Sequence, residues 1–179
     1  MKKTIVLLLA LCLVFMTACG SSSPSDALKA DLENAKASPE EIMGEMGDDG
    51  FGEKATQALI NKVLEFEYEL GKETIDGDTA TVETTIITYP FGEIFTNVVT
   101  NFIVEAYANA GNMTDEDISA LMDKLLVNEL QKAEKSYTKT IKISLAKEDG
   151  VWVVQEDKNM SNALTGGMLD FAENAALEQ

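Results

Sequence analysis

Alternating apolar and polar positions predict two β-hairpins in this chain. Between residues 64 and 70 every second side chain is apolar and the others are glutamates, which is the pattern of a strand with one buried and one wet face. Asp76-Gly77 is a typical hairpin turn, and a return strand rich in threonine and β-branched residues is expected from Thr79 to Tyr89. The alternation at Tyr137–Leu145 and the short apolar run Val151–Val154 predict the second hairpin.

Apolar side chains three and four positions apart predict helices around these hairpins. The clearest helix starts are Ser38-Pro39, where Glu41 completes a capping box, and Thr114, which precedes three acids. A glycine-rich acidic stretch at 44–52 lacks the spacing of a calcium loop, so it is expected to be a flexible turn. The expected helices cover residues 26–37, a short segment from 38, and residues 51–63, 91–107, 114–135 and 162–177.

The helix expected behind Pro90 is the most apolar segment after the N-terminal region. Its apolar residues run from Phe91 to Tyr107 at helical spacing, and threonines and asparagines lie between them. We expect it to pack in the core, with a membrane or partner surface as the alternative. The next helix is expected to bury one stripe of residues: Ile118, Leu121, Met122, Leu125 and Leu130.

Gly166-Gly167 interrupts the helical pattern of residues 162–177. Two glycines inside a helix cost roughly 2 kcal/mol compared with two alanines, so another feature must compensate. One explanation is that the helix backbone approaches the sheet closely at this point. The other is a bend that opens a pocket.

The N-terminal region has the form of a lipoprotein signal. Lys2-Lys3 precedes an unbroken apolar run from Ile5 to Met16, which is too short to cross a bilayer as a helix, and Met16-Thr17-Ala18-Cys19 resembles a bacterial lipobox. We therefore expect a signal peptide at 1–18, a diacylglycerol on Cys19 with a flexible tether at 19–25, and one α+β domain at 26–179. The alternative is an ordinary signal peptide cut near Ala18, which would leave Cys19 as a thiol.

Composition excludes several classes of function. All 14 basic residues are lysines and histidine is absent; after loss of the two signal lysines the formal charge becomes 12 − 31 = −19, so no nucleic-acid partner is expected. Without histidine or a free thiol, neither a Ser-His-Asp triad nor a usual zinc site can form. No cofactor, metal site or catalytic residue is predicted. Carboxylates, lysines and tyrosines are the remaining titratable groups.

The order of elements, with a hairpin around Lys147–Trp152 and a closing helix through Asn162–Gly167, resembles uncharacterised lipoproteins of Gram-positive gut bacteria. Their folded part is similar to the nuclear transport factor 2-like, or cystatin-like, cone. This resemblance implies an α+β fold in which an antiparallel sheet of two hairpins is wrapped by helices. The residues expected to line such a cone are Phe66, Tyr68, Val82, Ile141, Ile143 and Trp152.

Two functions follow as hypotheses. The first is a non-catalytic binding or interaction module, anchored to the outer face of the cell membrane through Cys19, that takes a protein partner or a small apolar ligand. The second is a cone enzyme, similar to isomerases or dehydratases, that uses one carboxylate and one tyrosine. Glu83 is the candidate carboxylate. None of the four tyrosines can be matched to a catalytic position of such enzymes: Tyr68, Tyr89, Tyr107 and Tyr137. The enzyme requires an inward-facing acid with a raised pKa beside a tyrosine hydroxyl.

Overall fold

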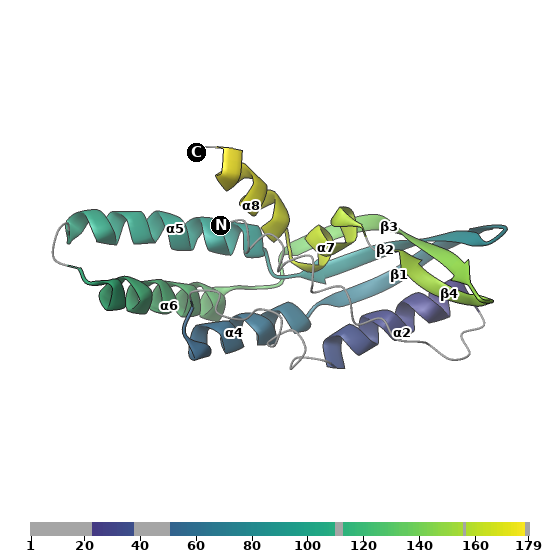
Figure 1. The fold of residues 1–179 in the computed structure, drawn as a ribbon, viewed down its shortest axis with the longest axis horizontal. Coiled ribbons are helices and arrows are strands. Elements are labelled where there is room, and N and C mark those ends of the chain that lie inside the picture. Colours follow the sequence, from purple (N-terminus) through teal and green to yellow (C-terminus); the bar gives the residue numbers. More distant parts are fainter. Residues whose placement is uncertain (1–22, 38–50, 110–112, 156, 178–179) are drawn as a thin grey trace.

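The molecule is elongated, with a β-sheet at one end and a helical hairpin at the other (Figure 1). This computed structural model describes residues 23–37, 51–109, 113–155 and 157–177. The elements, in chain order, are α2 (Pro24–Ala37), α4 (Glu53–Leu64), β1 (Glu67–Asp76), β2 (Thr79–Thr88), α5 (Phe91–Ala108), α6 (Asp115–Lys132), β3 (Tyr137–Glu148), β4 (Val151–Gln155), α7 (Lys158–Leu164) and α8 (Met168–Leu177).

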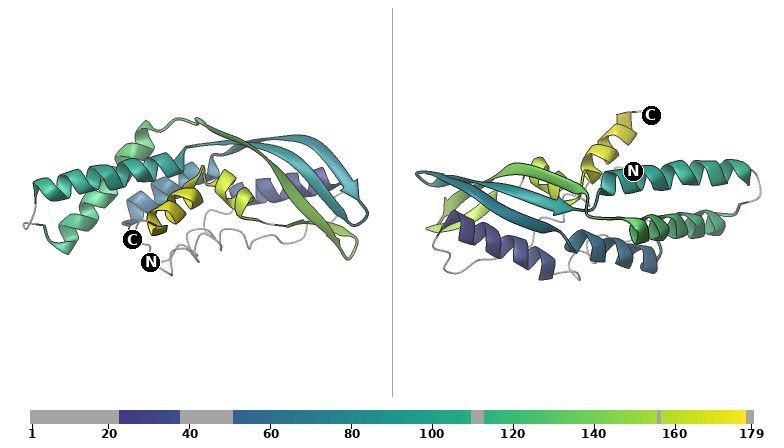
Figure 2. Two further views of the ribbon diagram at one scale, coloured as in Figure 1. Left: turned by 90° about the horizontal axis from the view of Figure 1, so that it is seen from above. Right: turned by 180° about the vertical axis from the view of Figure 1, so that it is seen from behind.

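Four antiparallel strands form one open sheet in the order β1-β2-β3-β4. The two hairpins, β1–β2 and β3–β4, are joined through the β2–β3 pair, whose register runs from Thr79 opposite Ala146 to Thr88 opposite Tyr137. The α5–α6 hairpin is inserted between β2 and β3 and projects from the end of the sheet where β2 finishes (Figure 2). The α+β class and both predicted hairpins are confirmed.

One face of the sheet is covered by α2 and α7 and forms the first core. Along β2 the even-numbered residues from Ala80 to Thr88 are buried, while the odd-numbered residues between them are exposed or half-buried. The buried face packs against Leu28 and Leu32 of α2 and against Met160 of α7. The alternation in the sequence therefore arises because helices cover only one face of the sheet.

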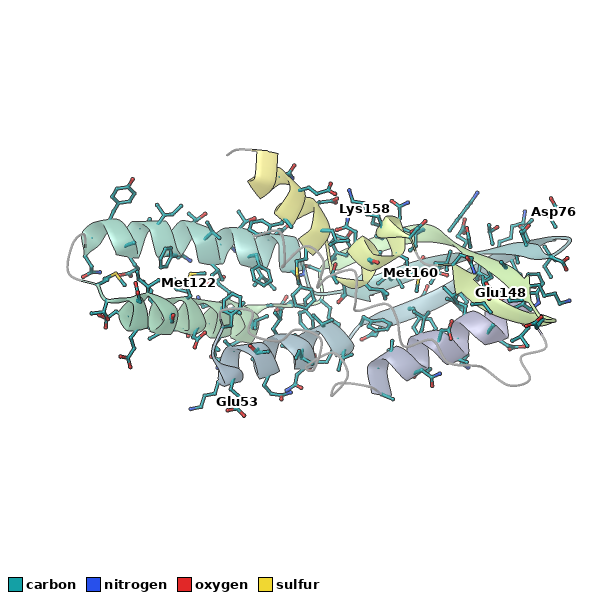
Figure 3. The ribbon with its side chains drawn as sticks, in the orientation of Figure 1. Glu53, Asp76, Met122, Glu148, Lys158 and Met160 are labelled. Carbon is teal, nitrogen blue, oxygen red and sulfur yellow. The ribbon has the colours of Figure 1, made fainter. Side chains whose placement is uncertain are left out.

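A second core lies among α4, α5 and α6, beyond the end of the sheet. Phe91 and Val98 of α5 and Leu126 of α6 are fully buried there, and Figure 3 shows Met122 between α5 and α6. Phe95 packs between Phe51 and the stacked ring of Phe171 from α8, at centroid distances of 6.3 and 6.0 Å. These contacts hold the first half of α5 in place.

Several element boundaries differ from the sequence prediction. Helix α2 begins at Pro24 rather than Asp26, because Ser23 caps it: Asp26 N donates to Ser23 Oγ at 3.1 Å and Ser23 Oγ donates to Asp26 Oδ2 at 2.8 Å. Helix α4 continues to Leu64, so β1 begins at Glu67, three residues later than predicted. The helix predicted from Ser38 and most of the glycine-rich turn lie outside the described residues.

The predicted closing helix at 162–177 is wrong as a single element, because the chain breaks it into α7 and α8. Gly166 and Gly167 have φ of +52° and +84°. The N–H groups of Gly166 and Gly167 donate to the carbonyl oxygens of Ala163 and Asn162, at 3.2 and 2.9 Å. This is a Schellman motif, which ends α7. The side chain of Asn162 then pairs with Asp170 in the first turn of α8.

The glycine corner lies directly against the start of α5. Gly92 N donates to Gly166 O at 3.1 Å, and a Cβ added to Gly166 would lie 1.9 Å from Tyr89 O. Close approach is therefore the explanation for Gly166, although the neighbour is the β2–α5 junction and not the sheet, whereas Gly167 is explained by its φ of +84°. Because backbone fills this space, the contact at Gly166 leaves no room for a pocket there.

Candidate functional site

The six residues predicted to line a cone belong to the first core. Five of them are at most 9% exposed, and Tyr68 is half-buried and packs against the same cluster. Since α2 and α7 cover this face, these side chains contact helices and do not form the wall of a cavity. The described residues form an open sheet, and a nuclear transport factor 2-like cone is not confirmed. The core-lining residues are Phe66, Tyr68, Val82, Ile141, Ile143 and Trp152.

Glu83 lies on the opposite, uncovered face of the sheet. It is exposed, and its register partner on β3 is Lys142. The inward acid that the enzyme hypothesis requires is therefore not Glu83, because the side chains of β2 that point inward are its even-numbered neighbours.

A cleft of about 510 Å³ lies between α2 and β1. In its lining Tyr68 Oη donates to Glu33 Oε1 at 2.7 Å. Lys36 lies 3.4 Å from Glu33 Oε1 and 4.8 Å from the centroid of the Tyr68 ring. Charged side chains make up most of the lining, which comprises Lys29, Glu33, Lys36, Glu67, Tyr68, Glu69, Leu70 and Ile87.

The protonation of this pair is opposite to what proton transfer requires. The pKa of Glu33 lies below its ordinary value, mainly because Tyr68 donates a hydrogen bond to the carboxylate. Burial acts in the opposite direction, and the attraction of Lys36 lowers the pKa further. Burial, together with the bond to Glu33, raises the pKa of Tyr68 to about 12. Glu33 is therefore a stable carboxylate and Tyr68 a stable phenol at neutral pH. A general base or acid would need a pKa closer to the working pH.

A second tyrosine, Tyr89, lies where the sheet meets the helical part. Its hydroxyl donates to Glu65 Oε2, and Lys62 Nζ donates to the same hydroxyl at 2.9 Å. The hydrogen bond with Tyr89 is the main reason that the pKa of Lys62 is raised. These bonds tie the end of α4 to the end of β2, which is a structural role.

Among the carboxyl groups of the described residues, Asp31 has a raised pKa. It lies on the buried face of α2 beside Leu28 and Leu32, and burial raises its pKa to about 6. Among the described residues, two tyrosine hydroxyls donate to a carboxylate: Tyr68 to Glu33 and Tyr89 to Glu65. The acid with the raised pKa, Asp31, is therefore not hydrogen-bonded to either of these tyrosines.

The largest departure from the sequence prediction is the exposure of α5. Only Phe91, Ile94 and Val98 of this helix are buried. The opposite side, which we call the α5 outer face, is exposed at each of its members: Thr96, Val99, Thr100, Ile103, Val104 and Tyr107. Val104 is 64% and Tyr107 80% exposed. On α6, Ile118 is also exposed, so its predicted burial is wrong.

The threonine hydroxyls of this face donate to backbone carbonyls of α5. Thr96 Oγ1 donates to Gly92 O, and Thr100 Oγ1 donates to Thr96 O, each at 2.8 Å. Because each hydroxyl already has a partner in the preceding turn, it competes little for bonds with solvent or a partner. The face therefore resembles a surface of valines in its chemistry.

The α5 outer face is also nearly free of charge. Between Ile94 and Asn109 the only charged side chain is Glu105, in a chain of formal charge −17. The adjacent apolar pair Val98-Val99 and the triple Phe102-Ile103-Val104 put apolar side chains on both sides of the helix. This all-round apolar pattern is the signal in the sequence that the helix has more apolar surface than one core contact can bury.

Within residues 23–37, 51–109, 113–155 and 157–177, no group of three or more acids could hold a metal ion. No helix in these ranges is both long and apolar enough to cross a membrane. Cys12 and Cys19, and so the predicted lipidation site, lie outside them.

Comparison with known proteins gives one similarity. No model of a known protein family matches the chain, and no curated protein matches it. Among solved structures, the chain is similar to the crystal structure of "a putative lipoprotein (ycdA)" from Bacillus subtilis, with a TM-score of 0.46 and 16% sequence identity. The similarity covers 92% of this chain and 55% of that protein, so this chain spans about half the length of its structural neighbour.

Proposed function

We propose that the chain is a lipoprotein of the outer face of the cell membrane and works as a non-catalytic protein-interaction module. Its anchor is a diacylglycerol on Cys19, and its contact surface is the α5 outer face. The observation that carries the proposal is the exposure of this face. Among the described residues, five of the six exposed large hydrophobic side chains are on the α5–α6 hairpin: Val99, Ile103, Val104, Tyr107 and Ile118.

An apolar patch of this kind supports binding of a macromolecule. These valines and isoleucines are 37–64% exposed, so burying the exposed part of one of them stabilises a complex by roughly 1 kcal/mol. Clustered exposed apolar residues are typical of interaction sites. A helix face is convex, whereas a small apolar ligand needs a concave site that encloses it. The cleft between α2 and β1 is concave but is lined mostly by charged residues. A protein partner therefore fits the surface better than a small ligand.

The ionisation of the carboxylate and tyrosine pairs supports a non-catalytic role. Tyr68 lowers the pKa of Glu33, and the buried acid Asp31 is not the partner of either tyrosine. Proton transfer would need an acid with a raised pKa beside a phenol.

The anchor is tested by two cysteine variants of the full chain. Cys19→Ala should move the protein from the membrane fraction to the soluble fraction, because it removes the site of both acyl chains. Cys12→Ala is the matched control and should stay in the membrane, since residue 12 belongs to the predicted signal. Membrane association that survives Cys19→Ala would refute the lipid anchor.

The contact surface is tested by photo-cross-linking in intact cells. A photoreactive amino acid at Val104 should give a covalent adduct with a protein, because this side chain is 64% exposed on the α5 outer face. The control position is Glu53, an exposed residue at the start of α4 that points away from α5 (Figure 3). Absence of an adduct at Val104, or equal adducts at both positions, would contradict the proposal.

A further inference from the structure

We infer that the partner of the α5 outer face is a second copy of this chain, and that the two α5 helices pack parallel to each other while both chains stay anchored. This inference rests on the proposed function. It adds the identity of the partner and the direction of the contact.

Charge favours a copy of the same chain. A strongly acidic protein repels a copy of itself over most of its surface, and this repulsion is weakest where the surface carries no charge. The α5 outer face is such a surface, because Glu105 is the single charge between Ile94 and Asn109. At physiological salt, charges more than about 8 Å from the contact are largely screened. Two α5 outer faces can therefore meet without placing a charged side chain of either face in the contact.

The position of the anchor gives the copies a common direction. Helix α2 runs opposite to β1: Ser25 N, at its start, donates to Glu73 Oε2 at 2.8 Å, and Glu33, near its end, accepts from Tyr68. The start of α2 therefore lies toward the β1–β2 turn, beside Asp76 in Figure 3. Pro24 is five residues after Cys19. A fully extended chain of five residues is at most about 18 Å long. The turn end of the sheet is thus the end held near the membrane.

The hairpin lies at the other end of the molecule. Strand β2, of 10 residues, is about 33 Å long, and α5, of 18 residues, is about 27 Å long. The two follow each other end to end (Figure 1), so the tip of α5 is about 60 Å from the turn. Copies anchored in one membrane share this polarity, and their α5 outer faces can lie at the same height.

The spacing of the outer residues suits the packing of two helices against each other. Thr96, Thr100, Ile103 and Tyr107 are four, three and four positions apart, and steps of four and three also alternate along a coiled-coil seam. The seam covers three turns, so the contact is short. Confinement of both copies to one membrane raises their local concentration and supports a weak contact.

Cysteine cross-linking of the full, anchored chain tests both the partner and the direction. Single variants Thr96→Cys and Tyr107→Cys are treated in membranes with a bismaleimide too short to span the roughly 16 Å that separates residues 96 and 107 along a helix. Each variant alone should give a dimer band. A mixture of the two variants, distinguished by tags of different size, should give no mixed band. Glu53→Cys and the parent chain, with Cys12 and Cys19 only, are the background controls, and retained Trp152 fluorescence checks the fold of each variant.

Three results would overturn the inference. A mixed band stronger than either single band would mean an antiparallel pair. Dimer bands no stronger than those of Glu53→Cys would mean random collision. The third result is a photo-adduct at Val104 whose mass differs from that of two chains, together with no cysteine dimers. It would agree with the proposed function but refute pairing of two copies. Salt gives an independent check, because screening should strengthen the dimer band as NaCl is raised, whereas a contact held by ion pairs would weaken.

Discussion

Replacing Gly166 by alanine should destabilise the protein by roughly 3–6 kcal/mol. A left-handed backbone costs an alanine about 1–2 kcal/mol, and φ at Gly166 is +52°. The added Cβ would lie 1.9 Å from Tyr89 O and 3.0 Å from Phe91 N, so backbone must move. This movement breaks the hydrogen bond from Gly92 N to Gly166 O, worth about 1 kcal/mol. Overpacking of the added methyl group against the backbone of Tyr89 and Phe91 costs about 1–3 kcal/mol more.

Gly150→Ala is the matched control, because Gly150 has φ of +86° but no atom within 4 Å of an added Cβ. It should lose only the backbone cost of about 1–2 kcal/mol. Both variants are compared in the unanchored Cys19→Ala background by urea unfolding, followed by the fluorescence of Trp152, the single tryptophan. Equal losses of unfolding free energy in the two variants would refute the close contact at the glycine corner as the reason for Gly166.

Three further predictions concern the first core and its acids. Trp152→Ala should cost roughly 3–5 kcal/mol of unfolding free energy, measured by circular dichroism in urea, since it truncates a large side chain that is 8% exposed; a loss below that of Val151→Ala would contradict its burial. Because the pKa of Asp31 in the folded chain is about 6 and its ordinary value is 3.8, the folded state binds this proton more tightly, so the stability it contributes is full below pH 3.8 and is lost as the pH rises through 6. Asp31→Asn should therefore gain stability relative to the parent over this window, and parallel pH profiles would refute the assignment. Tyr68→Phe should raise the pKa of Glu33 toward its ordinary 4.5, measured by NMR titration, because the lost hydrogen bond is the main cause of the lowered value; Tyr89→Phe should leave Glu33 unchanged.

The strands could be predicted from the sequence because a sheet covered on one face imposes a strict two-residue period. The burial of Trp152 and Ile143 followed directly from that period. The cleft between α2 and β1 could not be predicted, since it depends on where a helix distant in sequence crosses the strand. The start of α2 was missed although its signal is present: Ser23, Pro24 and Asp26 form the same kind of capping pattern as Ser38-Pro39.

The helical part shows what pattern alone leaves undecided. Apolar residues at helical spacing along α5 indicate which side chains can be buried, but burial also requires a neighbouring element. Phe95 has neighbours from α8 and from Phe51, whereas Val104 and Tyr107 extend beyond them and stay exposed. Likewise, Gly166-Gly167 was recognised as costly inside a helix. Glycine is a common residue just after a helix end, so the stop of α7 had a local signal, whereas the contact of Gly166 with Tyr89 is not revealed by the sequence.

The most direct test of the central claim is the reactivity of position 104 on intact cells. Val104→Cys, in the otherwise unchanged anchored chain, is labelled with a membrane-impermeant maleimide before and after the protein is purified and diluted in detergent. If the α5 outer face is occupied in its membrane, labelling on cells should be slower by about tenfold or more, which corresponds to about 1.4 kcal/mol of protection, and purification should restore the rate to that of Glu53→Cys. Equal labelling rates of Val104→Cys and Glu53→Cys on cells would contradict the account.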